Sequence, residues 1–146
     1  MKSILAIDVG KHGGYAFKKG KIEKTGILDF VSLEQYYRDI SALISVHKPY
    51  IVVSGYPTRF YNVIVFQSKL LAIVELAVET ARKFTLFMEV NDCQAKKAVI
   101  GSAKAKKADI MKKLKVKCEH SADALMFARF VNIQFEKSGQ NALVDS

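Results

Sequence analysis

An acidic residue interrupts an apolar segment near the start of the sequence. Asp8 follows four apolar residues, 4–7, and precedes Val9 and Gly10. Burying a carboxylate without a partner is costly, so such an acid is usually ion-paired or bound to a metal ion. The structural alternative is an aspartate that caps the glycine turn after it. Asp8 is therefore a candidate metal ligand, but the residue type alone does not distinguish metal binding from capping of the turn.

A second acid lies near the C-terminus beside a histidine. His120 and Asp123 are three residues apart, which places both on one face of a helix about one turn from each other. The two side chains can share a divalent cation, or one can bind it while the other moves a proton. Alternatively, His120 lies near the cap of the helix, and the negative charges of Glu119 and Asp123 interact favourably with the helix dipole.

Lysines surround a glycine between these two acids. Residues before and after Gly101 form a basic patch that consists of Lys96, Lys97, Lys104, Lys106 and Lys107. Such a patch neutralises backbone phosphates and carries no base-sequence information. A solvated lysine-rich helix face is the alternative.

A predicted loop contains an arginine next to two aromatic residues. Arg59, Phe60 and Tyr61 follow a β-branched run and precede a long apolar segment. An exposed aromatic beside an arginine can stack on an unpaired base. Packing of Phe60 beneath the loop is equally compatible with the sequence.

Alternating strands and helices must position these residues. Apolar patterning predicts an opening antiparallel meander and then strands that alternate with helices, which indicates a mixed sheet with helices on both faces. The predicted strands cover residues 3–10, 15–17, 22–30, 50–54 and 84–90; the predicted helices lie between Ser32 and Pro49 and over residues 63–83, 92–100, 105–114 and 120–135.

Composition narrows the class of protein. The chain has 146 residues, is half hydrophobic and carries a net charge of +9, so we expect one folded domain that favours polyanions, nucleic acid first and an anionic membrane surface second. Cys93 and Cys118 fit no metal-ligand spacing, and no segment approaches the roughly 20 apolar residues of a membrane span. We therefore expect a cytoplasmic protein, in a bacterial cell or a virus-infected host cell, without membrane association.

Four short stretches together carry a family resemblance. They are residues 4–10, Gln67, residues 95–101 with Lys107 six positions beyond Gly101, and residues 120–125. In this order and spacing the chain resembles the RuvC-type Holliday junction resolvases of the ribonuclease H-like superfamily, and its size suits a phage version. The resemblance implies an α/β fold with a five-stranded mixed sheet in the order 3-2-1-4-5, one nuclease domain over residues 1–137 and a polar tail over residues 138–146.

The resemblance also implies a mechanism and an assembly. Two Mg²⁺ or Mn²⁺ ions would hydrolyse a phosphodiester in branched DNA such as a four-way junction. By position, Asp8 and Asp123 are metal ligands, His120 stands where the family has Asp or His, and Lys96 and Lys107 match lysines that approach the phosphates, Lys107 within the catalytic set. The helix over residues 63–83 would form a homodimer.

One family residue is missing. The resolvases carry a catalytic glutamate at the end of the fourth strand, where this sequence has Ser54 or Gly55. Glu89 on the neighbouring strand is the best placed substitute; three protein ligands with a DNA phosphate are a second solution. Two rival functions follow: a junction-binding protein with weak or lost cleavage, and a related YqgF-type nuclease that acts on RNA.

Overall fold

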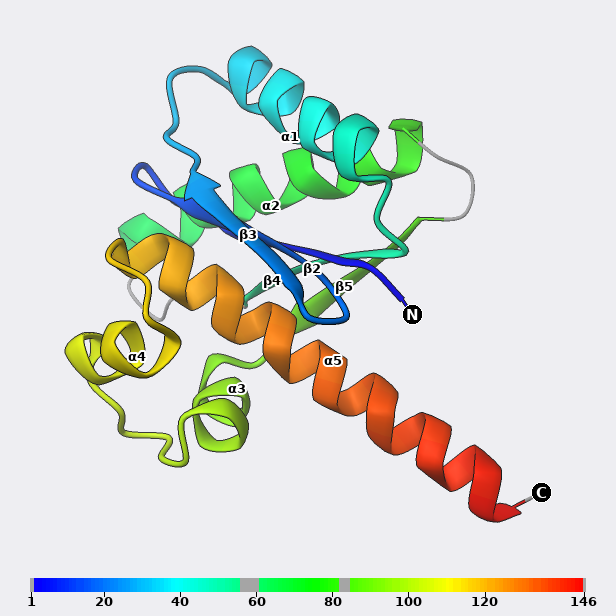
Figure 1. The fold of residues 1–146 in the computed structure, drawn as a ribbon. Helices are drawn as coiled ribbons and strands as arrows, with labels where there is room; N and C mark the ends of the chain where they lie inside the picture. The colour runs from blue at the N-terminus through cyan, green and yellow to red at the C-terminus, as the bar shows by residue number, and fades with distance from the viewer. Residues whose placement is uncertain (1, 56–60, 82–84, 146) are drawn as a thin grey trace.

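A five-stranded mixed sheet forms the centre of the computed structural model, which describes residues 2–55, 61–81 and 85–145, without the side chains of 61–63 and 140–145 (Figure 1). The strand order is β3-β2-β1-β4-β5, as predicted. β1 pairs antiparallel with β2 and parallel with β4, and β4 pairs parallel with β5. The strands are β1 Ile4–Asp8, β2 Gly14–Lys19, β3 Ile22–Ile27, β4 Ile51–Gly55 and β5 Leu86–Val90.

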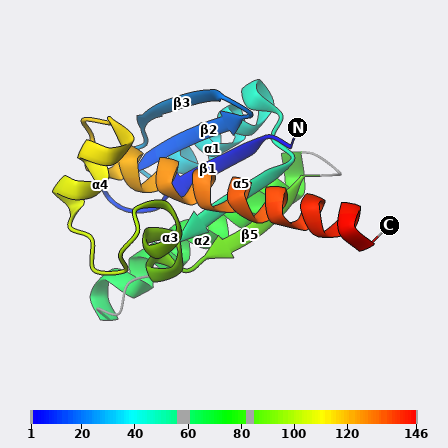
Figure 2. The same ribbon diagram turned by 60° about the horizontal axis from the view of Figure 1, so that its bottom comes forward.

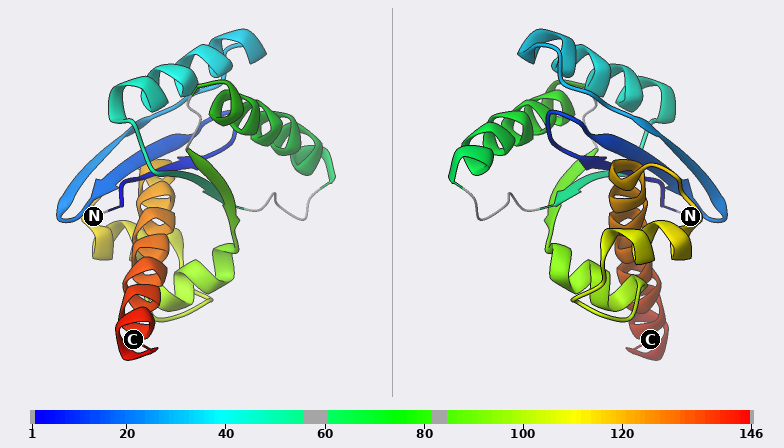
Figure 3. Two further views of the ribbon diagram at one scale, coloured as in Figure 1. Left: turned by 90° about the vertical axis from the view of Figure 1, so that its right-hand side faces the viewer. Right: turned by 90° about the vertical axis from the view of Figure 1, so that its left-hand side faces the viewer.

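Helices cover both faces of this sheet, which confirms the predicted layers. α1 and α2 lie on one face, and α5 crosses the other face with α3 and α4 beside it (Figures 2 and 3). The helices are α1 Leu33–His47, α2 Tyr61–Ala81, α3 Asp92–Val99, α4 Lys107–Leu114 and α5 Glu119–Asp145.

The alternation of side chains along β1 divides the core into two layers. Ile4 and Ala6 pack with the α5 layer, whereas Leu5 and Ile7 pack with α1 and α2. Successive residues of a strand point to opposite faces, so Asp8 belongs to the α5 face. The sheet thereby aims the first candidate acid at the helix that carries the other two candidates.

Local capping signals place two helix starts where the sequence predicts them. The Ser32 hydroxyl accepts a hydrogen bond from the Gln35 backbone N–H at 3.1 Å at the start of α1. The Asn91 side chain caps α3 in the same way through the Gln94 N–H at 3.0 Å. Lys48 ends α1 in the left-handed conformation, directly before Pro49.

Several predicted boundaries differ from the structure, most of all the ends of the third strand and of the last helix. The third strand ends at Ile27 rather than at residue 30, because Leu28 leaves the ladder and packs against the α1 and α2 layer. α5 extends to Asp145 instead of ending at residue 135, since no proline interrupts that stretch and the backbone continues through Gly139. A domain limit at residue 137 stays a prediction.

The carboxyl ends of three parallel strands meet at one edge of the sheet. Asp8 ends β1, Gly55 ends β4, and Val90 of β5 is the register partner of Gly55. α3 begins two residues after Val90. Parallel sheets commonly bind ligands at this edge, which is where chemistry-bearing residues of this chain gather.

Candidate functional site

Asp8 and His120 form a direct pair across the interface between β1 and α5. The His120 Nδ1 lies 2.9 Å from the Asp8 Oδ2, and both side chains are mostly buried, with exposed fractions of 27% and 21%. Burial raises the pKa of the Asp8 carboxyl, and the hydrogen bond with His120 opposes part of that rise. The same hydrogen bond raises the pKa of His120, which favours the protonated imidazole beside the carboxylate.

A close approach of α5 to β2 brings His120 to Asp8. Gly14 is the register partner of Asp8, and a Cβ atom at Gly14 would lie 2.5 Å from the Ser121 backbone nitrogen. The Ser121 hydroxyl donates a hydrogen bond to the Gly26 carbonyl at 2.7 Å. The absence of a side chain at Gly14 therefore allows the first turn of α5 to rest on the sheet next to Asp8.

Asp123 lies one helical turn after His120 and is half-buried. Burial first, and then the charge of Asp8, raise its pKa to about 7. The two carboxylates thus share one electrostatic environment, as the sequence predicted for Asp8, His120 and Asp123. In the absence of a cation, the ionisation of one disfavours the ionisation of the other.

Two predicted lysines lie close enough to act on these acids. The positive charge of Lys107 lowers the pKa of both Asp8 and Asp123, and that of Lys96 lowers the pKa of Asp123. Lys107 lies 3.5 Å from Glu119, whose carboxylate also lies 3.3 Å from the His120 Nε2. A basic rim therefore borders the acids at the starts of α4 and α5.

Asp92 is a further acid at the site that the sequence analysis did not single out. It opens α3, pairs with Lys96 at 2.8 Å, and its negative charge raises the pKa of Asp8 and of Asp123. Its position directly after a strand was the available signal, because such residues lie at the carboxyl edge of a parallel sheet. The helical pattern predicts Asp92 only as the first residue of a helix.

The end of β4 presents no carboxylate to this site. The Ser54 side chain is fully buried and donates a hydrogen bond to the Ile7 carbonyl at 2.9 Å. A Cβ atom at Gly55 would lie 2.8 Å from the ring of Phe127 on α5. The aromatic ring therefore occupies the space next to Gly55 on the α5 face.

Glu89 and Asp8 lie on opposite faces of the sheet. It is the register partner of Ser54, which in turn pairs with Ile7. Ile7 packs in the α1 and α2 layer, and side chains of one such row share a face. Glu89 is exposed at the edge of the sheet, so the structure does not bring it together with Asp8.

The remaining predicted DNA-binding residues divide into two groups. Lys97 lies exposed in the last turn of α3, and Lys104 and Lys106 lie exposed between α3 and α4. These lysines share one side of the molecule with the acids. Arg59 and Phe60 lie outside the described residues, as does the side chain of Tyr61, which begins α2.

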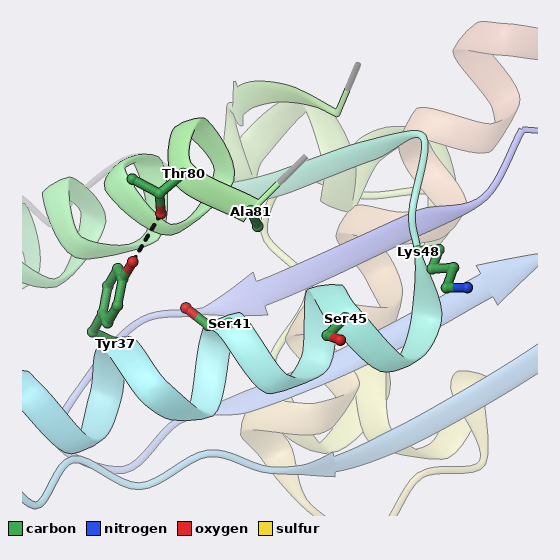
Figure 4. Close-up of a pocket in the computed structure, with 6 residues that line it drawn as sticks. All are labelled: Tyr37, Ser41, Ser45, Lys48, Thr80 and Ala81. Atoms are coloured by element: carbon green, nitrogen blue, oxygen red, sulfur yellow. Dashed lines mark hydrogen bonds between the residues drawn. The ribbon is translucent and has the colours of Figure 1, made fainter. Parts of the chain in front are cut away.

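A cavity between α1 and α2 is lined without acids. A cavity of about 450 Å³ lies between α1 and α2, on the sheet face away from Asp8, and the Tyr37 hydroxyl and Thr80 Oγ1 lie 2.8 Å apart beside it (Figure 4). Its lining consists of Tyr37, Ser41, Ser45, Lys48, Thr80 and Ala81. None of these side chains is an acid or a histidine, so this cavity does not offer the carboxylate oxygens that Asp8 and Asp123 bring to the carboxyl edge of the sheet.

The donor set at that edge fits a divalent cation with oxygen ligands. Within the described part of the chain, no three His, Cys, Asp or Glu side chains are already arranged around one point. Asp8 and Asp123 are nevertheless two carboxylates with pKa values raised by burial and, in Asp123, by the charge of Asp8. A bound cation would relieve both effects, and Mg²⁺ and Mn²⁺ prefer carboxylate oxygens.

Comparisons with known proteins identify the fold. No family model matches the sequence, and no curated protein does so significantly. The structure is similar to that of Thermus thermophilus RuvC, with a TM-score of 0.72 and 17% identity over 94% of this chain and 96% of that one. The same protein in complex with a Holliday junction substrate gives a TM-score of 0.70 with 18% identity, over 89% of this chain and 92% of that one.

A third similar structure is a resolvase from yeast mitochondria. The yeast mitochondrial Holliday junction resolvase Ydc2 matches with a TM-score of 0.63 and 11% identity, over 87% of this chain and 76% of that one. Among the described residues, no helix is long and apolar enough to cross a membrane.

The structural comparisons and the strand order agree. The chain has the fold of the RuvC-type Holliday junction resolvases, a five-stranded ribonuclease H-like sheet.

Proposed function

We propose that this protein is a structure-selective endonuclease that resolves Holliday junctions and other branched DNA with the help of Mg²⁺ or Mn²⁺. The observation that carries the proposal is the gathering of Asp8, His120 and Asp123 at the carboxyl edge of the sheet, bordered by Lys96 and Lys107. The structural relatives named above include resolvases, one of them in complex with its junction substrate.

Asp8 and Asp123 would hold the metal, with two ions expected per active site. Such ions supply an activated water and stabilise the leaving oxygen of the phosphodiester. His120 is held by Asp8 on one ring nitrogen and lies 3.3 Å from Glu119 on the other, so it can complete the ligand set or carry a proton between these carboxylates. Lys107 would neutralise the phosphate that enters beside the acids.

Lys96, Lys97, Lys104 and Lys106 would contact the DNA backbone around the cleavage point. Their ammonium groups recognise phosphates without reading bases, which suits recognition by the shape of a junction. Arg59, Phe60 and Tyr61 are proposed to act at the junction centre by stacking on an unpaired base.

The proposed active unit is a homodimer that packs through α2. Val65 and Leu76 on this helix are 42% and 47% exposed, and their spacing of 11 residues places them on one helical face. A two-fold dimer would present one active site to each of two junction strands.

Incubation of the protein with a synthetic four-way junction in Mg²⁺ or Mn²⁺ tests the proposal. We expect paired, symmetric nicks at the branch point and no cleavage of linear duplex of the same sequence. Equal cleavage of RNA without regard to branching would favour the YqgF-type alternative.

A junction-binding protein with weak or lost cleavage is the second candidate. The observation in its favour is the absence of a carboxylate at the end of β4, where Phe127 fills the space beside Gly55. Junction binding with no nicks in either metal would select this candidate over the nuclease.

A further inference from the structure

A groove of about 1050 Å³ lies between the β2–β3 hairpin and the second half of α5. The hairpin contributes residues 18–22, α5 contributes residues between 132 and 139, and Lys2 adds its side chain just before β1 begins. In Figures 1 and 2 these segments lie at the end of the molecule that holds the N-terminus, with α3 and α4 at the other end. Three distant parts of the sequence therefore build one surface feature.

This groove lies at the opposite end of the strands from the candidate acids. Lys18 in the groove pairs with Ile4, the first residue of β1, whereas Asp8 ends that strand. Phe135 in the groove follows Asp123 by 12 residues, which corresponds to about 18 Å along α5. DNA at the carboxyl edge of the sheet does not occupy this end of the molecule, so the groove is available to a second ligand.

Apolar side chains contribute to the lining of the groove. Ile22 is 56% exposed, and Phe135 is half-buried. The Phe135 ring packs edge-on against Tyr50, with ring centroids 6.0 Å apart, and the Lys2 ammonium lies over both rings at 4.8 and 4.7 Å. An apolar side chain that entered the groove would remove Ile22 and Phe135 from water, which favours binding.

Basic side chains surround these apolar residues. Of the described residues that line the groove, one is an acid, Glu136, and four are lysines: Lys2, Lys18, Lys19 and Lys21. Lys18 pairs with Glu23 at 3.2 Å. Within the part of the chain that the structure describes, Lys19 and Lys21 are exposed and enter no ion pair. The turn of the hairpin therefore carries two positive charges that an acidic ligand would neutralise.

We propose that this groove binds an acidic peptide segment of another protein. An apolar side chain of the segment would contact Ile22 and Phe135, and its carboxylates would meet Lys19 and Lys21. Charge complementarity selects an acidic partner. An apolar centre with a polar rim is the usual anatomy of a protein interface, whereas contacts with DNA phosphates depend on charge, so the apolar lining favours a peptide. The inference goes beyond the proposed nuclease function and does not depend on it.

NMR titration of the isotope-labelled protein with a panel of short synthetic peptides tests the proposal. Each probe has one leucine, phenylalanine or tryptophan flanked on both sides by glutamates and aspartates. Matched peptides carry alanine in place of the apolar residue, or glutamine and asparagine in place of the acids. We expect the acidic apolar peptides to shift amide signals within residues 18–22 and 132–139, and each matched peptide to bind at least about tenfold more weakly.

Variants of the groove separate the contribution of charge from that of apolar contact. The double variant Lys19→Glu/Lys21→Glu is expected to weaken peptide binding at least about tenfold, since it replaces attraction with repulsion. Ile22→Ser should cause a smaller loss, because it removes part of the apolar lining. Lys24→Glu/Lys48→Glu is the matched control, with the same change of charge at two exposed lysines outside the groove. Thermal unfolding checks that each variant is folded.

Several outcomes would overturn the proposal. Failure of every peptide in the panel to bind would do so, as would equal binding to Lys19→Glu/Lys21→Glu and to the matched control. The same titration with a short DNA duplex and with vesicles that contain anionic lipid covers the other polyanions. Shifts of the groove signals by either of these probes, without peptide binding, would replace the acidic peptide with nucleic acid or a membrane surface as the ligand.

Discussion

At the scale of single residues, the site combines burial with excess negative charge. Asp8 and Asp123 have raised pKa values, and the protonated form of His120 is favoured by its hydrogen bond with Asp8. Burial of a carboxylate costs several kcal/mol in the folded state, and the hydrogen bond with His120 offsets part of that cost at Asp8. The presence of both acids next to two lysines agrees with the proposed binding of a cation and a phosphate.

Replacement of Asp8 with asparagine tests this explanation. We expect Asp8→Asn to lower junction cleavage by at least about 100-fold, since it removes a metal-binding charge, and to leave junction affinity within about threefold, since phosphate contacts come from the lysines. Gel-based cleavage and fluorescence anisotropy measure the two effects.

Asp39→Asn is the control for that variant, because Asp39 is half-buried on α1, on the other face of the sheet, and hydrogen-bonds with Gln35. Cleavage by Asp8→Asn at the rate of the Asp39→Asn control would contradict the assignment of the site.

At the scale of elements, α5 acts as the scaffold that carries His120 and Asp123 over the sheet. Its first turn rests on Gly14 and is tied to β3 by the Ser121 hydroxyl. Further along, Arg129 donates two hydrogen bonds to Glu23 of β3, at 2.8 and 2.9 Å. These contacts fix the height and rotation of α5 and hence the separation of the acids.

Gly14→Ala is expected to disturb both stability and the site. The added Cβ meets backbone atoms of His120 and Ser121 at 2.6 and 2.5 Å, so α5 must shift, at a cost of about 1–3 kcal/mol in the free energy of unfolding. Urea unfolding measures the cost, and the His120 ring signals in NMR spectra report the changed contact with Asp8.

Gly139→Ala provides the matched control for Gly14→Ala. A Cβ at Gly139 has no heavy atom within 4 Å, and alanine in a helix is favoured over glycine, so this variant should gain about 0.5–1 kcal/mol. A Gly14→Ala protein as stable as the wild type would show that α5 does not depend on this close approach.

The contact between Glu23 and Arg129 should make the free energy of unfolding decrease as the solution becomes acidic. The hydrogen bond with Arg129 lowers the pKa of Glu23 from its ordinary value of 4.5. The ionised form therefore stabilises the fold above that ordinary pKa, and this contribution is lost as the pH falls through the lowered value. We expect the free energy of unfolding of Glu23→Gln to decrease less than that of the wild type as the pH falls.

Urea unfolding between about pH 6 and pH 3 measures this slope. Glu34→Gln is the control, because Glu34 pairs with Arg38 on the exposed side of α1 and its side chain is 73% exposed. The idea fails if Glu23→Gln and the wild type lose stability in parallel.

At the scale of the whole molecule, the net charge of +9 favours DNA, and the lysine-bearing helices α3 and α4 lie beside α5, on the sheet face of the candidate acids (Figure 3). The opposite sheet face bears α1 and α2 (Figure 3). In the proposed dimer, α2 would pack against a second copy on one side while the acids and lysines meet DNA on the other.

A charge on α2 should therefore disrupt the proposed dimer. We expect Leu76→Lys to shift the protein to the monomer in sedimentation velocity experiments and to convert paired nicks into single nicks, because a buried unpaired lysine opposes association. Val46→Lys on α1, where Val46 is 74% exposed, is the control. A Leu76→Lys protein that sediments like Val46→Lys would argue against α2 as the interface.

Local patterns in the sequence predicted the order of the elements and marked three candidate site residues, whose roles came from the family resemblance. The apolar run before Asp8 predicted a buried strand, Ser32 and Pro49 bracketed α1, and the spacing of His120 and Asp123 placed both on one helical face. These features depend on neighbours within a few positions, so they can be read without knowledge of the fold. The strand order came from a resemblance spread over four short stretches, and the structure confirmed it.

Only the tertiary structure decided which acids meet and which do not. Glu89 and Asp92 are three residues apart, yet strand register places Glu89 in the row of Ile7, while the turn into α3 places Asp92 at the carboxyl edge of the sheet, where β1 ends at Asp8. The ring of Phe127 fills the space at Gly55 through a contact across 72 positions of sequence. Such outcomes depend on register and helix packing between distant segments, and no local pattern encodes them.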